Sequence, residues 1–214
     1  MGSSSSVFEY KYNIYNSEDF PYVPLNKTTF LFKGNIFNTN IKKNFFPEHI
    51  TEIIFNDSYD QEIKIGIFPK NLQILKFGNN FNQDIMPRVL PLTLKSLYFG
   101  NEFNMDITEK VLPEGLEFLK LGSKFKKSLS LPNSLKKLEI YGNMNDKTLL
   151  DNLQPSVTTL IINNLNFEIT NLSPTITKII LPYYNRKILN FIKKVPHGTK
   201  VFDEDQDVEL IVTD

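Results

Sequence analysis

The chain has 214 residues, of which 41% are hydrophobic and 22% charged, so it can bury the core of one domain or at most two. Its 24 basic and 24 acidic residues give a formal net charge of zero. The basic excess typical of phosphate-binding proteins is therefore missing, and nucleic acid is not expected as a partner. The absence of cysteine excludes disulfides and thiolate chemistry and fits a reducing compartment.

No apolar run is long enough for a membrane span, and the N-terminal residues lack the hydrophobic core of a signal peptide. We therefore expect a cytoplasmic protein without stable membrane insertion. Residues 1–23 predict a tail and a capping strand. Gly2 fits the N-myristoylation pattern, although a flexible serine-rich tail explains these residues equally well. Residues 8–14 alternate between apolar and polar side chains, as a strand covering the end of a stack would.

Residues 24–182 consist of degenerate repeats of about 22 residues. Three segments beginning at Phe68, Leu90 and Leu112 align without gaps, and their prolines recur at 69, 91 and 113. The shared pattern is Pro-x-x-Leu-x-x-Leu-x-Phe/Leu-Gly-x-x-Phe-x-x-x-Ile/Leu. Less regular copies open at Pro24, Pro47, Pro132, Pro155 and Pro174. The sequence thus holds about eight units, more than the roughly three that a stable stack needs.

Each repeat predicts one short strand, because inward and outward side chains alternate in segments such as Leu75-Lys76-Phe77. The glycine that follows, Gly78 in this copy, is expected to permit a backbone turn that a Cβ would hinder. In the next segment, Phe81 is expected to pack inside while Asn82 satisfies turn backbone. A single repeat cannot bury its apolar side alone, so the repeats should stack in parallel around a continuous core.

The strings from Phe77 to Ile85 and from Phe99 to Ile107 resemble the FNIP repeat family of amoebae and of the giant viruses that infect them. The strand segment Leu-x-x-Leu-x-Leu/Phe is similar to that of leucine-rich repeats. The resemblance implies a mainly β, leucine-rich-repeat-like parallel β-solenoid that serves as a protein-interaction scaffold, in the host cytoplasm if the chain is viral. Family members often follow an F-box that recruits a ubiquitin ligase. No F-box-like helical segment is evident in this sequence, so an adaptor role would need a separate subunit.

Residues 183–214 predict a C-terminal cap. Apolar residues recur at helical spacing from Ile188 to Val195, which predicts a short helix ended by Pro196. The segment from Val208 predicts a closing strand. The acids at 203–207 alternate as in a calcium loop, but Val208 stands where that loop needs glycine, so we interpret them as a solvated acidic edge.

Catalysis is not expected. The two histidines, His49 and His197, are far apart in the sequence and form no metal-binding spacing, and no glycine-rich phosphate loop is present. We therefore expect no catalytic residues, no metal site and no cofactor.

The outward side chains of the strands are the best candidates for a binding site, because they should lie on the open face of the sheet. The middle column contains Leu31, Ile54, Lys76, Tyr98, Lys120, Glu139, Ile161 and Ile180. The column before it contains Thr29, Glu52, Ile74, Ser96, Phe118, Lys137, Thr159 and Lys178. We predict that a protein partner of unknown identity binds to an apolar patch with lysines at its rim, formed by Ile54, Ile74, Lys76, Tyr98, Phe118 and Lys120. Two alternatives remain open: terminal segments or another copy cover this face, or the protein is a structural component that self-assembles through it.

Overall fold

The computed structural model describes residues 6–11, 21–141, 150, 153–164, 168–181, 188, 190–203 and 209–210. Within these residues, eleven strands form a single sheet in which their spatial order is their order in the chain. The strands are β1 Val7–Lys11, β2 Thr29–Lys33, β3 Glu52–Ile54, β4 Ile74–Lys76, β5 Ser96–Tyr98, β6 Phe118–Leu121, β7 Lys137–Ile140, β8 Thr159–Ile162, β9 Lys178–Leu181, β10 Lys200–Asp203 and β11 Glu209–Leu210. Strands β1 to β10 are parallel, and β11 is antiparallel to β10.

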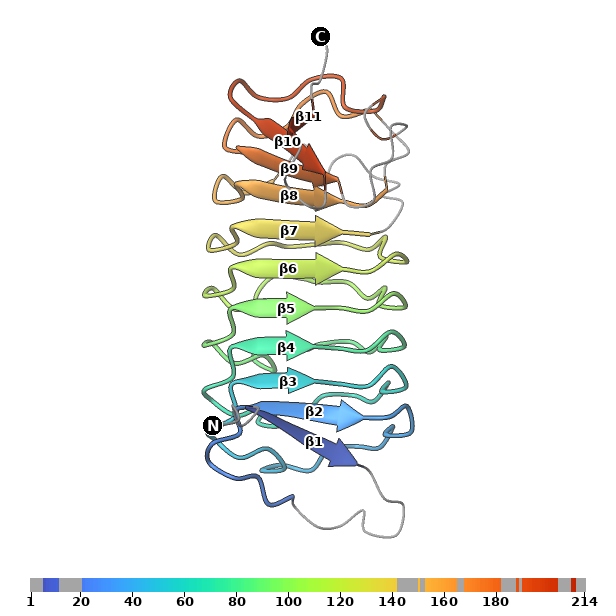
Figure 1. The fold of residues 1–214 in the computed structure, drawn as a ribbon, viewed down its shortest axis with the longest axis vertical. Coiled ribbons are helices and arrows are strands. Elements are labelled where there is room, and N and C mark those ends of the chain that lie inside the picture. The colour runs from blue at the N-terminus through green and yellow to red at the C-terminus, as the bar shows by residue number, and fades with distance from the viewer. Residues whose placement is uncertain are drawn as a thin grey trace, which may run out of the picture.

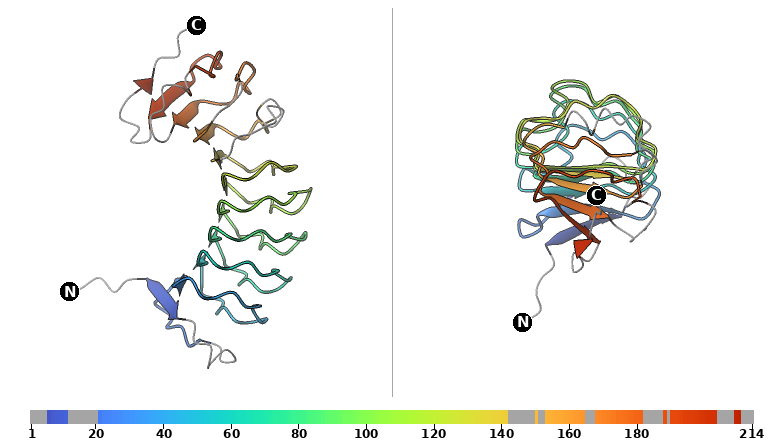
Figure 2. Two further views of the ribbon diagram at one scale, coloured as in Figure 1. Left: turned by 90° about the vertical axis from the view of Figure 1, so that its right-hand side faces the viewer. Right: turned by 90° about the horizontal axis from the view of Figure 1, so that it is seen from above.

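The chain forms a solenoid, because each of the strands β2 to β6 is followed by a loop that passes behind the sheet and returns to start the next strand (Figure 1). The stack is curved. The strands line the inner, concave side of the arc, and the loops form its outer side (Figure 2). The predicted parallel β-solenoid with little helix is confirmed.

The core contains two ladders of aromatic rings, one at the end of the strands and one in the loops. In the strand ladder, Phe32, Phe55, Phe77 and Phe99 stack nearly parallel, with centroids 4.9, 5.4 and 5.6 Å apart. The loop ladder consists of Phe37, Tyr59, Phe81, Phe103 and Phe125, with centroids 5.7, 6.3, 6.2 and 6.1 Å apart. Repetition of the same ring at the same place in each repeat allows these rings to stack from one turn to the next.

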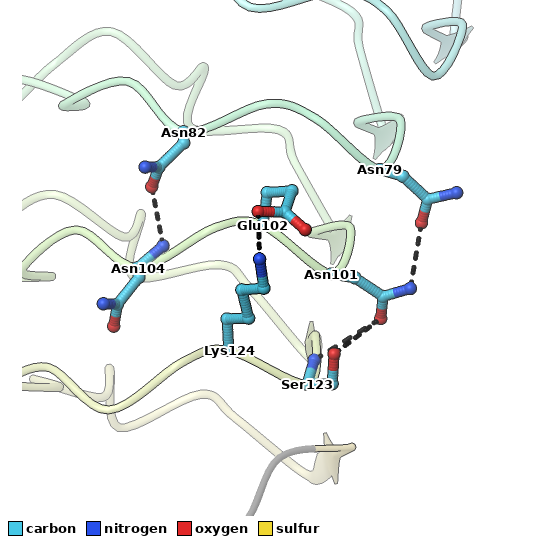
Figure 3. Close-up of polar contacts among 7 residues, drawn as sticks. All are labelled: Asn79, Asn82, Asn101, Glu102, Asn104, Ser123 and Lys124. Atoms are coloured by element: carbon cyan, nitrogen blue, oxygen red, sulfur yellow. Dashed lines mark hydrogen bonds and ion pairs between the residues drawn. The ribbon is translucent and has the colours of Figure 1, made fainter.

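Polar side chains connect the turns outside this core (Figure 3). The Oδ1 atom of Asn82 accepts a hydrogen bond from the backbone N–H of Asn104 at 2.8 Å, and Oδ1 of Asn104 accepts one from the N–H of Lys126 at 2.9 Å. Asp60 accepts the N–H of Asn82 in the same way, at 2.9 Å. The expected structural role of the Phe-Asn pairs is confirmed. The backbone group that each asparagine satisfies, however, belongs to the next repeat.

The glycines after the strands lie where a side chain would be hindered, as expected. Gly78, Gly100 and Gly122 do not have positive φ. A Cβ at Gly100 would instead lie 2.2 Å from the carbonyl oxygen of Gly78, and one at Gly122 would lie 2.0 Å from that of Gly100. The expected hindrance of a Cβ is therefore confirmed, and its source is the close approach of the neighbouring turn.

Left-handed residues recur at one position on the outer side of the solenoid. They are Asn44, Gly66, Arg88 and Lys110, with φ of 65°, 82°, 71° and 66°. Each is the third residue of a four-residue turn. At Arg88, the N–H of Val89 donates to the carbonyl of Met86 at 3.2 Å, and the other three turns have the equivalent hydrogen bond. This pattern is typical of a type II turn, which favours glycine or asparagine at the third place. Arg88 and Lys110 therefore adopt a conformation that is unfavourable for their residue type.

At the N-terminal end, β1 includes Phe8 and Tyr10 of the expected capping strand; residues 12–14 and Gly2 lie outside the described residues. At the C-terminal end, Ile188 is helical, but from Ile192 onward the chain is not, because Ile192 forms a parallel bridge with Ile169. The expected helix therefore does not continue to Val195. The acidic residues 204–207 lie outside the described part.

No helix among the described residues has the length and apolar character needed to cross a bilayer.

Candidate protein-interaction face

The two outward columns of the sheet form a continuous concave surface, called the strand face below. Its register is the one predicted. The first column runs Thr29, Glu52, Ile74, Ser96, Phe118, Lys137, Thr159 and Lys178, and the second runs Leu31, Ile54, Lys76, Tyr98, Lys120, Glu139, Ile161 and Ile180. The structure thus brings all six predicted binding residues together on strands β3 to β6, and all six are half-buried.

The centre of the strand face is an aromatic pair. The rings of Tyr98 and Phe118 are 4.8 Å apart and tilted by 50°. Ile74 lies two strands from Phe118 in the same column, and Ile54 lies two strands from Tyr98 in the other. The structure places these four side chains on neighbouring strands of one face, with Ser96 and Lys76 between them in the two columns, and all four are half-buried.

The two lysines that were predicted at the rim, Lys76 and Lys120, form ion pairs with glutamates of the strand face. Lys76 Nζ lies 2.7 Å from Glu52 Oε1 and 5.3 Å from the centroid of the Tyr98 ring. The other carboxylate oxygen of Glu52 accepts a hydrogen bond from Thr29 Oγ1 at 3.0 Å. Lys120 Nζ lies 3.2 Å from Glu139 Oε1. Sequence reasoning missed these pairs, although each glutamate stood in a predicted column one repeat away from its lysine.

The environment of Lys120 keeps this residue charged. Burial by itself would lower the pKa of Lys120, but attraction to the Glu139 carboxylate and hydrogen bonds to Glu139 and Tyr141 outweigh it and raise the pKa above its usual value. The ammonium lies 4.2 Å from the centroid of the Tyr141 ring, which stabilises it further. Lys120 is therefore a permanent positive charge at neutral pH.

The strand face is open only in part. Ile161 and Ile180 are 7% and 5% exposed, although they lie in an outward column and not in the main core cluster. At the other end, Thr29 on β2 is 6% exposed, so the open part, in which every outward residue is half-buried, runs from β3 to β7. Among the described residues, the most exposed large apolar side chains lie in loops that no repeat pattern had singled out: Tyr22, Leu25, Ile36, Ile65, Met86 and Leu92.

The residues considered for catalysis show no shared site. His49 and His197 lie in separate turns. In the part of the chain that the structure describes, no group of three or more histidine, aspartate or glutamate residues could hold a metal ion. The predicted absence of catalysis stays a prediction.

Comparison with known proteins agrees with this architecture. The FNIP repeat model matches residues 37–80, 59–102, 81–124 and 103–143. Among solved structures, CroV588, described as a novel circular LRR protein, superposes with a TM-score of 0.71 at 32% sequence identity. The match covers 85% of this chain and 27% of CroV588, so this chain spans only about a quarter of that protein's length. The predicted leucine-rich-repeat-like fold is thereby confirmed. No curated protein matches the chain significantly.

Proposed function

Because the chain belongs to the FNIP repeat family, we propose that it is a protein-interaction module whose partner binds the open part of the strand face. The observation that supports this most directly is the aromatic pair of Tyr98 and Phe118, which shares the outward face of strands β3 to β6 with Ile54 and Ile74. Half-exposed aromatic and aliphatic side chains of this kind are typical anchors of protein interfaces. As a binding module, the protein would need no cofactor or catalytic group.

The scaffold beneath the patch is well suited to recognition. The inward neighbours of these residues, Leu75, Leu97 and Leu119, are fully buried, and the strands are tied to one another on both sides. The outward side chains are therefore held in fixed positions before a partner arrives. Such preorganisation reduces the entropy lost on binding and so favours affinity.

The test is an affinity pull-down with matched variants. Tyr98→Ala/Phe118→Ala removes the aromatic pair of the strand face, whereas Leu25→Ala/Leu92→Ala removes two highly exposed apolar side chains from the loops. Both variants should keep a cooperative thermal transition. We expect specific partners to be lost with the first variant and retained with the second. Loss with both variants, or with neither, would contradict binding through the strand face.

Two other functions are tested by related measurements. The first is a structural protein that self-assembles through the strand face. It predicts a molar mass that rises with concentration in sedimentation experiments and falls in Tyr98→Ala/Phe118→Ala. A ubiquitin-ligase adaptor predicts that a ligase subunit with its own F-box co-purifies with the chain.

A further inference from the structure

One positive charge on the open part of the strand face is not balanced by a carboxylate. Strands β3 to β7 contribute three lysines and two glutamates to the two outward columns. Both glutamates are occupied, Glu52 by Lys76 and Glu139 by Lys120. The third lysine, Lys137, makes no ion pair with any described residue. It is half-buried, with Nζ 5.2 Å from the centroid of the Phe118 ring.

This charge lies at one end of the apolar patch. Ile74, Ser96, Phe118 and Lys137 follow one another in one column on adjacent strands. Phe118 contacts the Tyr98 ring and also lies beneath the Lys137 ammonium. Since adjacent strands are about 4.8 Å apart, the column from Ile74 to Lys137 is roughly 14 Å long. An extended peptide segment of about four or five residues covers that distance.

The position of Lys137 restricts which segments can bind. A purely apolar segment that packed on Phe118 would remove water from the neighbouring ammonium and leave the charge buried without a partner, which is strongly unfavourable. A segment with a carboxylate at this point would pair with the ammonium and avoid that penalty. A basic segment would be repelled. Charge complementarity therefore selects acidic partners over other apolar segments.

We propose that the strand face binds an acidic peptide segment of another protein, in which apolar side chains pack on Ile74, Tyr98 and Phe118 and a nearby carboxylate pairs with Lys137. This inference rests on the proposed function and specifies the chemistry of the partner.

Selection from a random displayed-peptide library against the purified protein tests the proposal. Selected peptides should combine aspartate or glutamate with apolar residues within a few positions. Their dissociation constants, measured by fluorescence anisotropy, should rise at least about tenfold with Lys137→Glu. Lys127→Glu is the matched control, because it makes the same charge reversal at an exposed loop lysine away from the strand face, and it should leave binding unchanged. Replacing the peptide carboxylate by its amide should weaken binding to the wild type but not to Lys137→Glu.

The outcomes separate this inference from the function on which it rests. Peptides that lose binding with Tyr98→Ala/Phe118→Ala, but lack acidic residues and bind equally to Lys137→Glu, would overturn the acidic-partner inference and leave the binding face intact. A selection in which no peptide depends on either variant would overturn both.

Discussion

Replacement of Gly100 by alanine tests how closely the turns of this solenoid are packed. A Cβ at this position would lie 2.2 Å from the carbonyl oxygen of Gly78 and 2.6 Å from the Cα of Asn79. The shortest comfortable distance between carbon and a carbonyl oxygen is about 3.3 Å. The two turns must therefore separate by roughly 1 Å, because both contacting groups are backbone and cannot rotate away.

The expected loss follows from what holds these turns together. The N–H of Phe77 bonds to the carbonyl of Tyr98 at 2.9 Å, and the N–H of Glu102 bonds to that of Asn79 at 2.9 Å. A separation of about 1 Å breaks both bonds, at about 0.5–1.5 kcal/mol each, and loosens the ring stack beside them. Together with strain of about 1–3 kcal/mol for overpacking, we expect Gly100→Ala to lower the free energy of unfolding by about 3 kcal/mol.

Urea unfolding followed by circular dichroism measures this loss, and Gly34→Ala provides the control. Gly34 has a φ of +84° and no atom within 4 Å of the added Cβ, so this variant tests backbone conformation without a clash. It should lose only about 1 kcal/mol. If Gly100→Ala were as stable as the wild type, or no less stable than Gly34→Ala, the close approach of the turns would be refuted.

Substitutions at three further positions test other features by the same unfolding assay. Arg88→Gly should raise the free energy of unfolding by about 0.5–1 kcal/mol because it relieves a left-handed conformation, and a loss would show that Arg88 is unstrained. Tyr59→Phe should stabilise the protein by about 1 kcal/mol, because the buried hydroxyl has no hydrogen-bond partner. Burial raises the pKa of Tyr59 above its ordinary value of 10.0, so the folded protein keeps a proton that the unfolded chain releases. The wild type should consequently lose stability above pH 10.0 more steeply than Tyr59→Phe, and parallel pH curves would contradict this. Asn82→Ala should lose about 1–2 kcal/mol by leaving the N–H of Asn104 without its acceptor, whereas Asn82→Asp, which keeps an acceptor, should lose less; equal losses would exclude the proposed bond.

Much of the fold could be predicted from the sequence because three copies of the repeat align with one another without gaps. Once the gapless copies fix the spacing, parallel stacking assigns each outward residue a neighbour in the next repeat. The pairing of Lys76 with Tyr98, for example, follows from their equal place in the pattern. The columns of the strand face were therefore correct from β2 to β9, the strands for which they were predicted.

The ion pairs, the burial of outward residues and the role of the glycines depend on distances between atoms in space, which the spacing of residues in the sequence does not determine. Whether Lys76 contacts Glu52 depends on the rotamers of two long side chains in different columns. The burial of Ile180 depends on which residues cover this outward position, and the repeat pattern does not predict them. The role of Gly100 could not be separated from that of a turn glycine, because both give the same residue in the sequence.

The hydrogen-bond ladder from Asp60 through Asn104 has a consequence for how such a chain can change in length. Each rung needs only an equivalent residue one turn later, so duplication or deletion of a whole repeat leaves the remaining rungs intact. Gain or loss of a single residue between two rungs would disrupt them. The concave surface can therefore grow or shrink only in steps of one strand, about 4.8 Å each, and every step adds or removes two outward side chains.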